Sequence, residues 1–132
     1  TGNFLGTDLA GNVVPPGPII QQVGVMFLSS GNSQIGGVTA CERNVISGNS
    51  KSGVDIEGPN NAAADKELVI GNYIGTDHNG TLALGNREAG VILSDKTRGN
   101  RIGGPGEAGN IISGNGGPGI WLFRRWRRGF SP

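Results

Sequence analysis

The sequence has little of what most globular cores and most catalytic sites are made of. Only 5% of its 132 residues are aromatic, 16% are charged, and it has one Cys and one His. A single Cys cannot form an internal disulfide, and one Cys with one His cannot supply an ordinary zinc site. No apolar run approaches the roughly 20 residues that cross a bilayer. The sequence therefore predicts neither a disulfide-stapled domain, a zinc protein nor a membrane span.

Charge of one sign is also missing from most of the chain. Lys and Arg total 11 and Asp and Glu total 10, so the molecule as a whole steers no charged partner. The exception is FRRWRRGF, 123–130, which holds four Arg residues. We expect residues 124–132 to form a basic tail outside the main fold. Such a tail could bind an anionic polysaccharide, a membrane surface or nucleic acid. Four Arg residues do not specify which of these partners would bind, and we do not expect nucleic acid. An unstructured tail without a partner is the simpler interpretation.

Glycine, in contrast, is abundant, with 26 residues of 132 against an ordinary share of about 7%. The glycines follow no Gly-X-Y period, which excludes a collagen helix. Val, Ile and Leu occur in short runs separated by Gly and Asn. This pattern is typical of short strands joined by tight turns, and 132 residues suffice for one all-β domain.

Three phrases of the sequence occur more than once. GNFLGTD, 2–8, returns as GNYIGTD at 71–77, and NVISGN, 44–49, returns as NIISGN at 110–115. A third phrase begins at intervals of 29, 37 and 29 residues, at Gly24, Gly53, Gly90 and Gly119. Self-similarity at such intervals indicates a repeat architecture, in which each unit buries its apolar face only by stacking on its neighbours.

The repeat predicts a solenoid in which each interval forms one rung. Each interval contains about three short runs rich in Val, Ile and Leu, and none has the length or one-sided polarity of an amphipathic helix. Parallel rungs stack about 4.8 Å apart, so that equivalent residues lie above one another. We expect a parallel β-helix of about four to five rungs, with three short strands each, over residues 1–123.

The stacking also predicts which side chains form the core. Two inward ladders are expected on the strand that carries the third phrase, namely Val25, Val54, Val91 and Ile120, and Phe27, Ile56, Leu93 and Leu122. A second face is expected to stack Ile46, Ile74 and Ile112. The Asn residues that recur at the turns can hydrogen-bond along the stack, as side-chain amides do in stacked sheets.

The phrases GNYIGTD, GNRIGG and NVISGN resemble the repeat of right-handed parallel β-helix proteins of the pectin-lyase-like group. The resemblance covers residues 2 to about 123. It implies a right-handed coil and a segment of a bacterial secreted or surface repeat protein, so we expect an extracellular or cell-surface location. The group contains lyases, hydrolases, epimerases, esterases, adhesins and phage tail parts, so the resemblance implies no single function.

The repeat has no recognisable cap at either end. It opens inside a rung at GNFLGTD and stops at FRRWRRGFSP. Solenoids normally carry caps, and open strand edges favour pairing with another chain. We therefore expect either a segment of a longer array or a homo-oligomer that forms through the open ends or an apolar outer face.

The outward positions of the third phrase are the candidate site. Alternate residues of a strand face outward, which predicts an outer column of Met26, Leu28, Asp55, Glu57, Ile92, Ser94, Trp121 and Phe123. Asp55 and Glu57 would lie about 7 Å apart, a separation that suits the acid and base of an inverting glycosidase. Trp121, Phe123, Met26 and Ile92 would then contact the sugar. The alternative is that the carboxylates are solvated and the apolar residues form a contact patch.

Two functions follow from this column. The first is a structural and binding module of a bacterial extracellular protein, with the outer strand face as a glycan-binding surface. The second is a small polysaccharide-active enzyme of the glycoside hydrolase or lyase type that uses Asp55 and Glu57. A hydrolase triad of His78 with Ser47, Ser94 or Ser113 is a third hypothesis, although no GxSxG elbow is present. The sequence contains no calcium-binding repeat, EF-hand or phosphate loop, and it predicts no metal or cofactor.

Overall fold

The computed structural model describes residues 1–18, 21–58, 64–95 and 97–123, and the predicted basic tail lies outside them. Short strands and two single-turn 3-10 helices, η1 (Ala40–Glu42) and η2 (Gly106–Ala108), make up its secondary structure. The strands are β1 (Phe4–Leu5), β2 (Val25–Leu28), β3 (Gln34–Gly36), β4 (Val45–Ile46), β5 (Val54–Gly58), β6 (Ala64–Asp65), β7 (Leu68–Ile70), β8 (Tyr73–Ile74), β9 (Val91–Asp95), β10 (Thr97–Arg98), β11 (Arg101–Ile102), β12 (Ile111–Ile112) and β13 (Ile120–Phe123).

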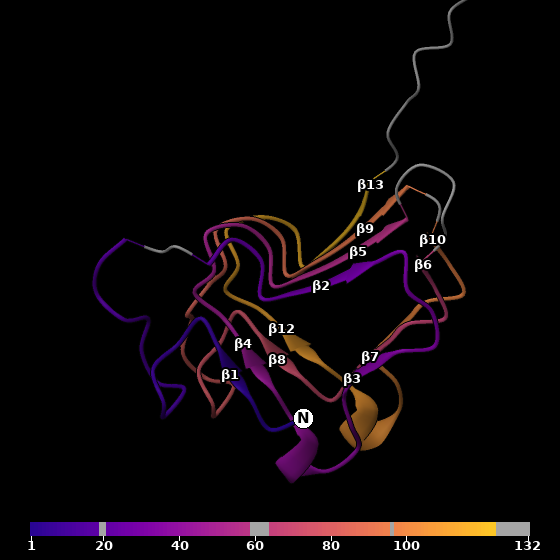
Figure 1. Ribbon diagram of the computed structural model, residues 1–132. Helices are drawn as coiled ribbons and strands as arrows, with labels where there is room; N and C mark the ends of the chain where they lie inside the picture. Colours follow the sequence, from indigo (N-terminus) through magenta and orange to yellow (C-terminus); the bar gives the residue numbers. More distant parts are fainter. Residues whose placement is uncertain (19–20, 59–63, 96, 124–132) are drawn as a thin grey trace, which may run out of the picture.

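The strands form four parallel sheets. Their orders are β1-β4-β8-β12 in sheet A, β2-β5-β9-β13 in sheet B, β6-β10 in sheet C and β3-β7-β11 in sheet D. The chain visits the sheets in turn and returns one strand further along each time, so its successive coils stack (Figure 1). We call β1–β3 coil 1, β4–β7 coil 2, β8–β11 coil 3 and β12–β13 coil 4. The prediction of an all-β fold with parallel strands is confirmed.

The number of strands in a coil differs from the prediction. We expected three, but complete coils have four, because the expected third strand is divided between sheets C and D. At this corner stand Asn32, Lys66 and Gly99, whose φ angles are 60°, 61° and 63°. A left-handed residue interrupts an extended strand, so the chain bends here and continues in another sheet. The described residues contain four strands each in sheets A and B, which agrees with the lower end of the expected number of rungs.

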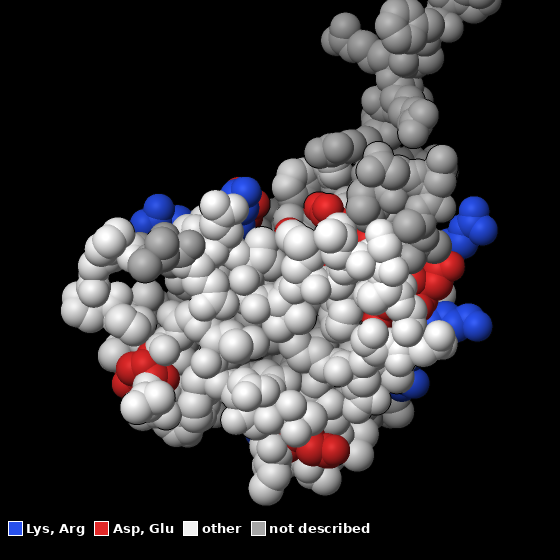
Figure 2. All heavy atoms as spheres, in the orientation of Figure 1, with Lys and Arg blue, Asp and Glu red and all other residues white. Residues whose placement is uncertain are grey.

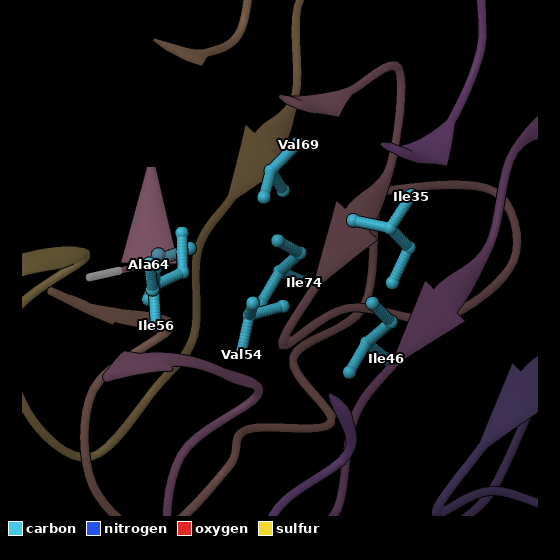
Figure 3. Packing of buried hydrophobic residues seen from close by; sticks show 8 residues of the cluster. Ile35, Ile46, Val54, Ile56, Ala64, Val69 and Ile74 are labelled. Carbon is cyan, nitrogen blue, oxygen red and sulfur yellow. The ribbon is translucent and has the colours of Figure 1, made fainter. Parts of the chain in front are cut away.

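The predicted register of sheet B is confirmed. Val25 pairs with Val54, Val54 with Val91, and Val91 with Ile120. Ile46, Ile74 and Ile112 stack in sheet A, as predicted. The side chains from the sheets meet in one core, shown in Figure 3, whose buried members are Ile35, Ile46, Val54, Ile56, Ala64, Val69, Ile74 and Val91.

Two columns of Asn side chains bind each coil to the next. In the first column the Oδ1 atoms of Asn44, Asn72 and Asn110 each accept the backbone N–H of the Asn one coil earlier, at 3.0, 3.3 and 2.8 Å. In the second column Asn86 and Asn115 do the same at 3.1 Å. The amide groups in turn donate to backbone carbonyls; Asn72 Nδ2, for example, lies 3.0 Å from the oxygens of Ile35 and Ile70. These bonds satisfy backbone groups at the corners that the sheets leave unpaired.

A third column contains a buried carboxylate that the sequence did not reveal. Glu67 is fully buried, and its Oε2 accepts the backbone N–H of Ser33 at 2.9 Å. Its own backbone N–H donates to Asn100 Oδ1 at 2.8 Å, and its Oε1 accepts the hydroxyl of Ser30 at 2.9 Å. Glu67 thus takes the place of an Asn in a stacked column, with a structural role.

The structural repeat spans two coils. Coils 1 and 3 carry the GTD phrase and a long loop before sheet B, whereas coils 2 and 4 carry NVISGN or NIISGN and a short connection. Asp8 and Asp77 fold the long loops, because each Oδ1 accepts two backbone N–H groups four and five residues later. The loops bond to each other from His78 N to Gly11 O at 2.9 Å.

These loops cover the outer face of sheet A. A Cβ on Gly80 would lie 3.0 Å from Ile111 and 3.1 Å from the ring of Tyr73, so only glycine lets the loop approach this closely. The loop of coil 3 also reaches coil 2, where Gly48 N donates to Leu84 O at 2.8 Å. Val45, an outward residue of sheet A, is consequently only 3% exposed. The loops therefore cover only the middle of this face, because Phe4 and Ile111 on the end strands remain 43% and 37% exposed.

We expect Asn72→Ala to lower the free energy of unfolding by about 2–4 kcal/mol. The variant leaves the buried N–H of Asn44 and the carbonyls of Ile35 and Ile70 without their partner, and each such group costs about 1–3 kcal/mol. Urea denaturation followed by circular dichroism measures the change. The control is Asn12→Ala, because Asn12 is exposed on a loop. Equal loss in both variants would contradict a stabilising role for the Asn column.

Candidate functional site

The outer face of sheet B contains the predicted site residues in two rows. Met26, Asp55, Ile92 and Trp121 occupy successive strands of one row, as the register of β2, β5, β9 and β13 requires. The second row contains Leu28, Glu57, Ser94 and Phe123. The sheet thus brings the predicted acid and base onto one strand and places the aromatic pair two strands away.

The aromatic pair is a preformed unit at one edge of this face. The ring centroids of Trp121 and Phe123 lie 5.5 Å apart with an interplanar angle of 69°, an edge-to-face contact. The side chains remain 43% and 41% exposed. Met26 and Leu28 are exposed at the opposite edge, on β2. Both edges of the face therefore present apolar side chains to solvent.

Asp55 differs from the solvated surface residue considered above. It is only 8% exposed, between Met26 and Ile92 in its row, and the hydroxyl of Ser52 donates to its Oδ1. Burial raises the pKa of the Asp55 carboxyl above its ordinary value, and the negative charges of Glu57 and Glu88 raise it further. The Ser52 hydrogen bond and the positive charge of Lys51 act in the opposite direction.

The electrostatics of this face are acidic on an otherwise apolar background. Two carboxylates, those of Glu57 and Glu88, and the ammonium group of Lys51 act on the Asp55 carboxyl. Acidic atoms emerge among largely uncharged atoms above the strands of sheet B (Figure 2). A carboxyl with a raised pKa can donate a proton, and a second carboxylate on the same strand can accept one. The arrangement therefore has the residue types of an acid–base pair.

The hypothetical hydrolase triad is not assembled among the described residues. The Ser47 hydroxyl is buried, donates to Thr76 O at 2.7 Å and accepts Gly75 N–H at 3.0 Å, so it has a structural role. His78 lies exposed on the loop of coil 3, and no hydrogen bond of the described residues joins it to Ser47, Ser94 or Ser113. The sequence supplied the residue types for a triad without the geometry.

One pocket and one free thiol lie elsewhere in the described part of the molecule. A pocket of about 370 Å³ lies between β1 and the proline-containing loop before β2, and it includes none of the predicted site residues. Cys41 is an exposed thiol on η1. In the part of the chain that the structure describes, no three His, Cys, Asp or Glu residues gather as metal ligands, and no helix is long and apolar enough to span a membrane.

Sequence reasoning missed the residues that surround Asp55. Ser52, Lys51 and Glu88 belong to the connections before β5 and β9, outside the strand pattern that identified the outer column. The signal for Ser52 was its position three residues before Asp55, where a short hydroxyl side chain can reach a neighbouring acceptor. Glu88 approaches only because coil 3 stacks on coil 2, where the Glu88 N–H donates to Lys51 O at 3.0 Å.

Comparison of the chain with protein family models, with curated proteins and with solved structures finds no match.

We expect Asp55→Asn to change how stability depends on pH. The folded state binds the Asp55 proton more tightly than the unfolded state, so the free energy of unfolding falls as pH rises above the ordinary value of 3.8 and levels off above the raised pKa. The variant lacks this decline. Urea denaturation of both proteins between about pH 4 and pH 7 measures it.

Glu57→Gln serves as the control for this experiment. It removes one repulsive charge while the Ser52–Asp55 contact remains, so the decline should become smaller without vanishing. Backbone N–H donors are the chief cause of the lowered pKa values of Asp8 and Asp77. These two carboxylates have the opposite pH dependence, because their contribution to the free energy of unfolding is lost as pH falls below 3.8. Parallel curves for wild type and Asp55→Asn would contradict the assigned pKa shift.

Proposed function

We propose that this chain is a right-handed parallel β-helix of the pectin-lyase-like kind that serves as a structural and binding module, with the outer face of sheet B as a polysaccharide-binding surface. Parallel strands joined by crossovers are right-handed in about 98% of cases, and the stacked coils are compatible with that hand. The resemblance of the GNYIGTD and NVISGN phrases supports the family and an extracellular or cell-surface location in a bacterium.

The observation that carries this proposal is the exposed pair of Trp121 and Phe123 at one edge of the outer face of sheet B. Large aromatic side chains that remain exposed on a soluble surface mark a contact site, and their amphipathic rings suit the apolar faces of sugar rings. Met26 and Leu28 extend the contact surface across the sheet. A polymer that lies across the four strands would contact both edges.

The rigidity of the scaffold also supports binding. The backbone of sheet B is held by parallel pairing over its whole width and by the second Asn column, which precedes its strands. A surface that is already ordered loses little conformational entropy when a ligand binds. The face can therefore act as a preformed platform without a moving loop.

We expect wild type to bind at least one polymer of a panel of neutral and charged polysaccharides, and Trp121→Ala/Phe123→Ala to weaken that binding at least about tenfold. Loss of two central aromatic contacts costs more than about 1.4 kcal/mol, which is tenfold in affinity. Isothermal titration calorimetry or affinity electrophoresis measures it. Leu82→Ala, an exposed apolar residue on the loop of coil 3, is the control. Unchanged binding in the double variant would reject the aromatic face as the site.

A polysaccharide-active enzyme is the second candidate function. The raised pKa of Asp55 and the presence of Glu57 on the same strand support it, because a protonated acid beside an ionised carboxylate is the pairing that glycoside hydrolysis uses. In this mechanism Asp55 protonates the leaving oxygen and Glu57 activates water.

If this second function holds, wild type releases reducing ends or unsaturated products from one polymer of the same panel. Asp55→Asn and Glu57→Gln should then each lower the rate by at least about a hundredfold, the contribution of a general acid or base. Binding without product release from any polymer would leave the binding module as the function.

Association of the chain with itself also stays a prediction. The sheets are open, and all four side chains of β13 are exposed. Light scattering that detects only monomer would contradict it.

A further inference from the structure

We propose that the outer face of sheet B selects glycans that carry free amino groups, such as polymers of glucosamine, over uronic acid polymers. This inference rests on the proposed function and names the ligand class for the same site. It commits the unpartnered face to one occupant, a cationic sugar chain that places its rings on Trp121 and Phe123 and its ammonium groups on the acidic strand β5.

Charge complementarity is the first reason. The groups that act on the position of Asp55 are its own carboxyl, those of Glu57 and Glu88, and the ammonium of Lys51. A uronic acid polymer would add one negative charge per sugar to this surplus of carboxylates, and the middle of the face has no Arg or Lys in either row to receive it. The carboxylates of the face attract an ammonium group on the ligand and repel a carboxylate on the ligand.

The hydrogen bonding of Asp55 is the second reason and is independent of the first. The hydrogen bonds of the described residues reach the Oδ1 of Asp55, through Ser52, and its Oδ2 is not among the buried atoms that lack a partner. A carboxylate has about four acceptor positions, so Asp55 can accept further hydrogen bonds from a ligand. A ligand ammonium, which has three donors and no acceptor, supplies both a hydrogen bond to Oδ2 and the opposing charge.

The position of Asp55 on the face agrees with this role. Its neighbours in the row, Met26 and Ile92, are apolar and supply neither a donor nor a positive charge. Trp121 is two strands away in the same row, about 10 Å at the usual spacing of neighbouring strands. An oligosaccharide that stacks on Trp121 therefore extends past Asp55.

The test compares three soluble oligosaccharides of equal length at low salt, namely a glucosamine oligomer, the same oligomer fully N-acetylated, and an oligogalacturonide. Calorimetric titration of the whole chain should give at least about tenfold tighter binding of the glucosamine oligomer than of either other ligand. This preference should shrink when ionic strength rises to about 0.5 M, because salt screens partly exposed charges.

Two variants test whether the acidic residues around Asp55 cause the preference for the free amine. Asp55→Asn keeps a partner for Ser52 but replaces an acceptor with a donor, and Glu57→Gln/Glu88→Gln removes the flanking charges. Each should reduce the preference for the free amine at least about fivefold while binding of the N-acetylated oligomer changes little. Glu107→Gln, which removes a carboxylate beside Arg43 and far from sheet B in the coil, is the matched charge control.

The outcomes distinguish failure of the proposed amino-sugar selectivity from failure of glycan binding itself. If the N-acetylated oligomer or the oligogalacturonide binds as tightly as the glucosamine oligomer, and Trp121→Ala weakens that binding, the face binds glycans but the proposed selectivity is wrong. If none of the three binds, both the selectivity and glycan binding by this face are rejected for these sugars.

Discussion

The register between one coil and the next is the constraint on which the rest of the structure depends. A coil this short cannot bury its own apolar side chains, so every core residue is buried by residues of the coils above and below. The Asn columns fix that register, because each Oδ1 reaches the backbone N–H of only one residue in the neighbouring coil. Glycine allows the close approach: a Cβ on Gly53 would lie 2.7 Å from the carbonyl oxygen of Gly90. A shift of one residue would break these bonds and turn the core side chains outward.

The same constraint explains which parts of the chain could be predicted from sequence. Stacked positions need the same residue types in each coil, so the repeated phrases predicted the stacking in sheets A and B and the role of the Asn residues correctly. Ile120 and Leu122 stack as predicted, but on the last strand they are exposed and lie outside the core. Features that occur only once in each pair of coils, or once in the chain, are not repeated in this way and could not be predicted from the repeat. Glu67 replaces an Asn in a column, but from the sequence alone it is expected to be an ordinary exposed charged residue. The fourth strand depends on the left-handed corner at Lys66, a backbone conformation that its side chain does not indicate.

The positions of the candidate residues on the outer face of sheet B were predicted correctly, but their environment was predicted incompletely. Alternation along β5 correctly placed Asp55 and Glu57 on the outer face, because alternation is a local property of a strand. Burial of Asp55 is not local. It arises from Met26 and Ile92 on neighbouring coils and from Ser52 on the preceding connection. An outward position alone predicts a solvated carboxylate for Asp55, whereas its burial raises its pKa.

The two-coil repeat explains why function is best sought on sheet B. The long loops of coils 1 and 3 fold over the outer face of sheet A, where Gly11 and Gly80 approach the aromatic rings of Phe4 and Tyr73. The 3-10 helices η1 and η2 occupy the corner between sheets D and A, where Arg43 and Glu107 pair across it at 3.3 Å. Sheet B has four full-length strands and, among the described residues, no loop of this kind folded over its outer rows. Its outward side chains point away from the core, so the change from Asp55 to Ile92 to Trp121 along one row can serve binding without disturbing the core.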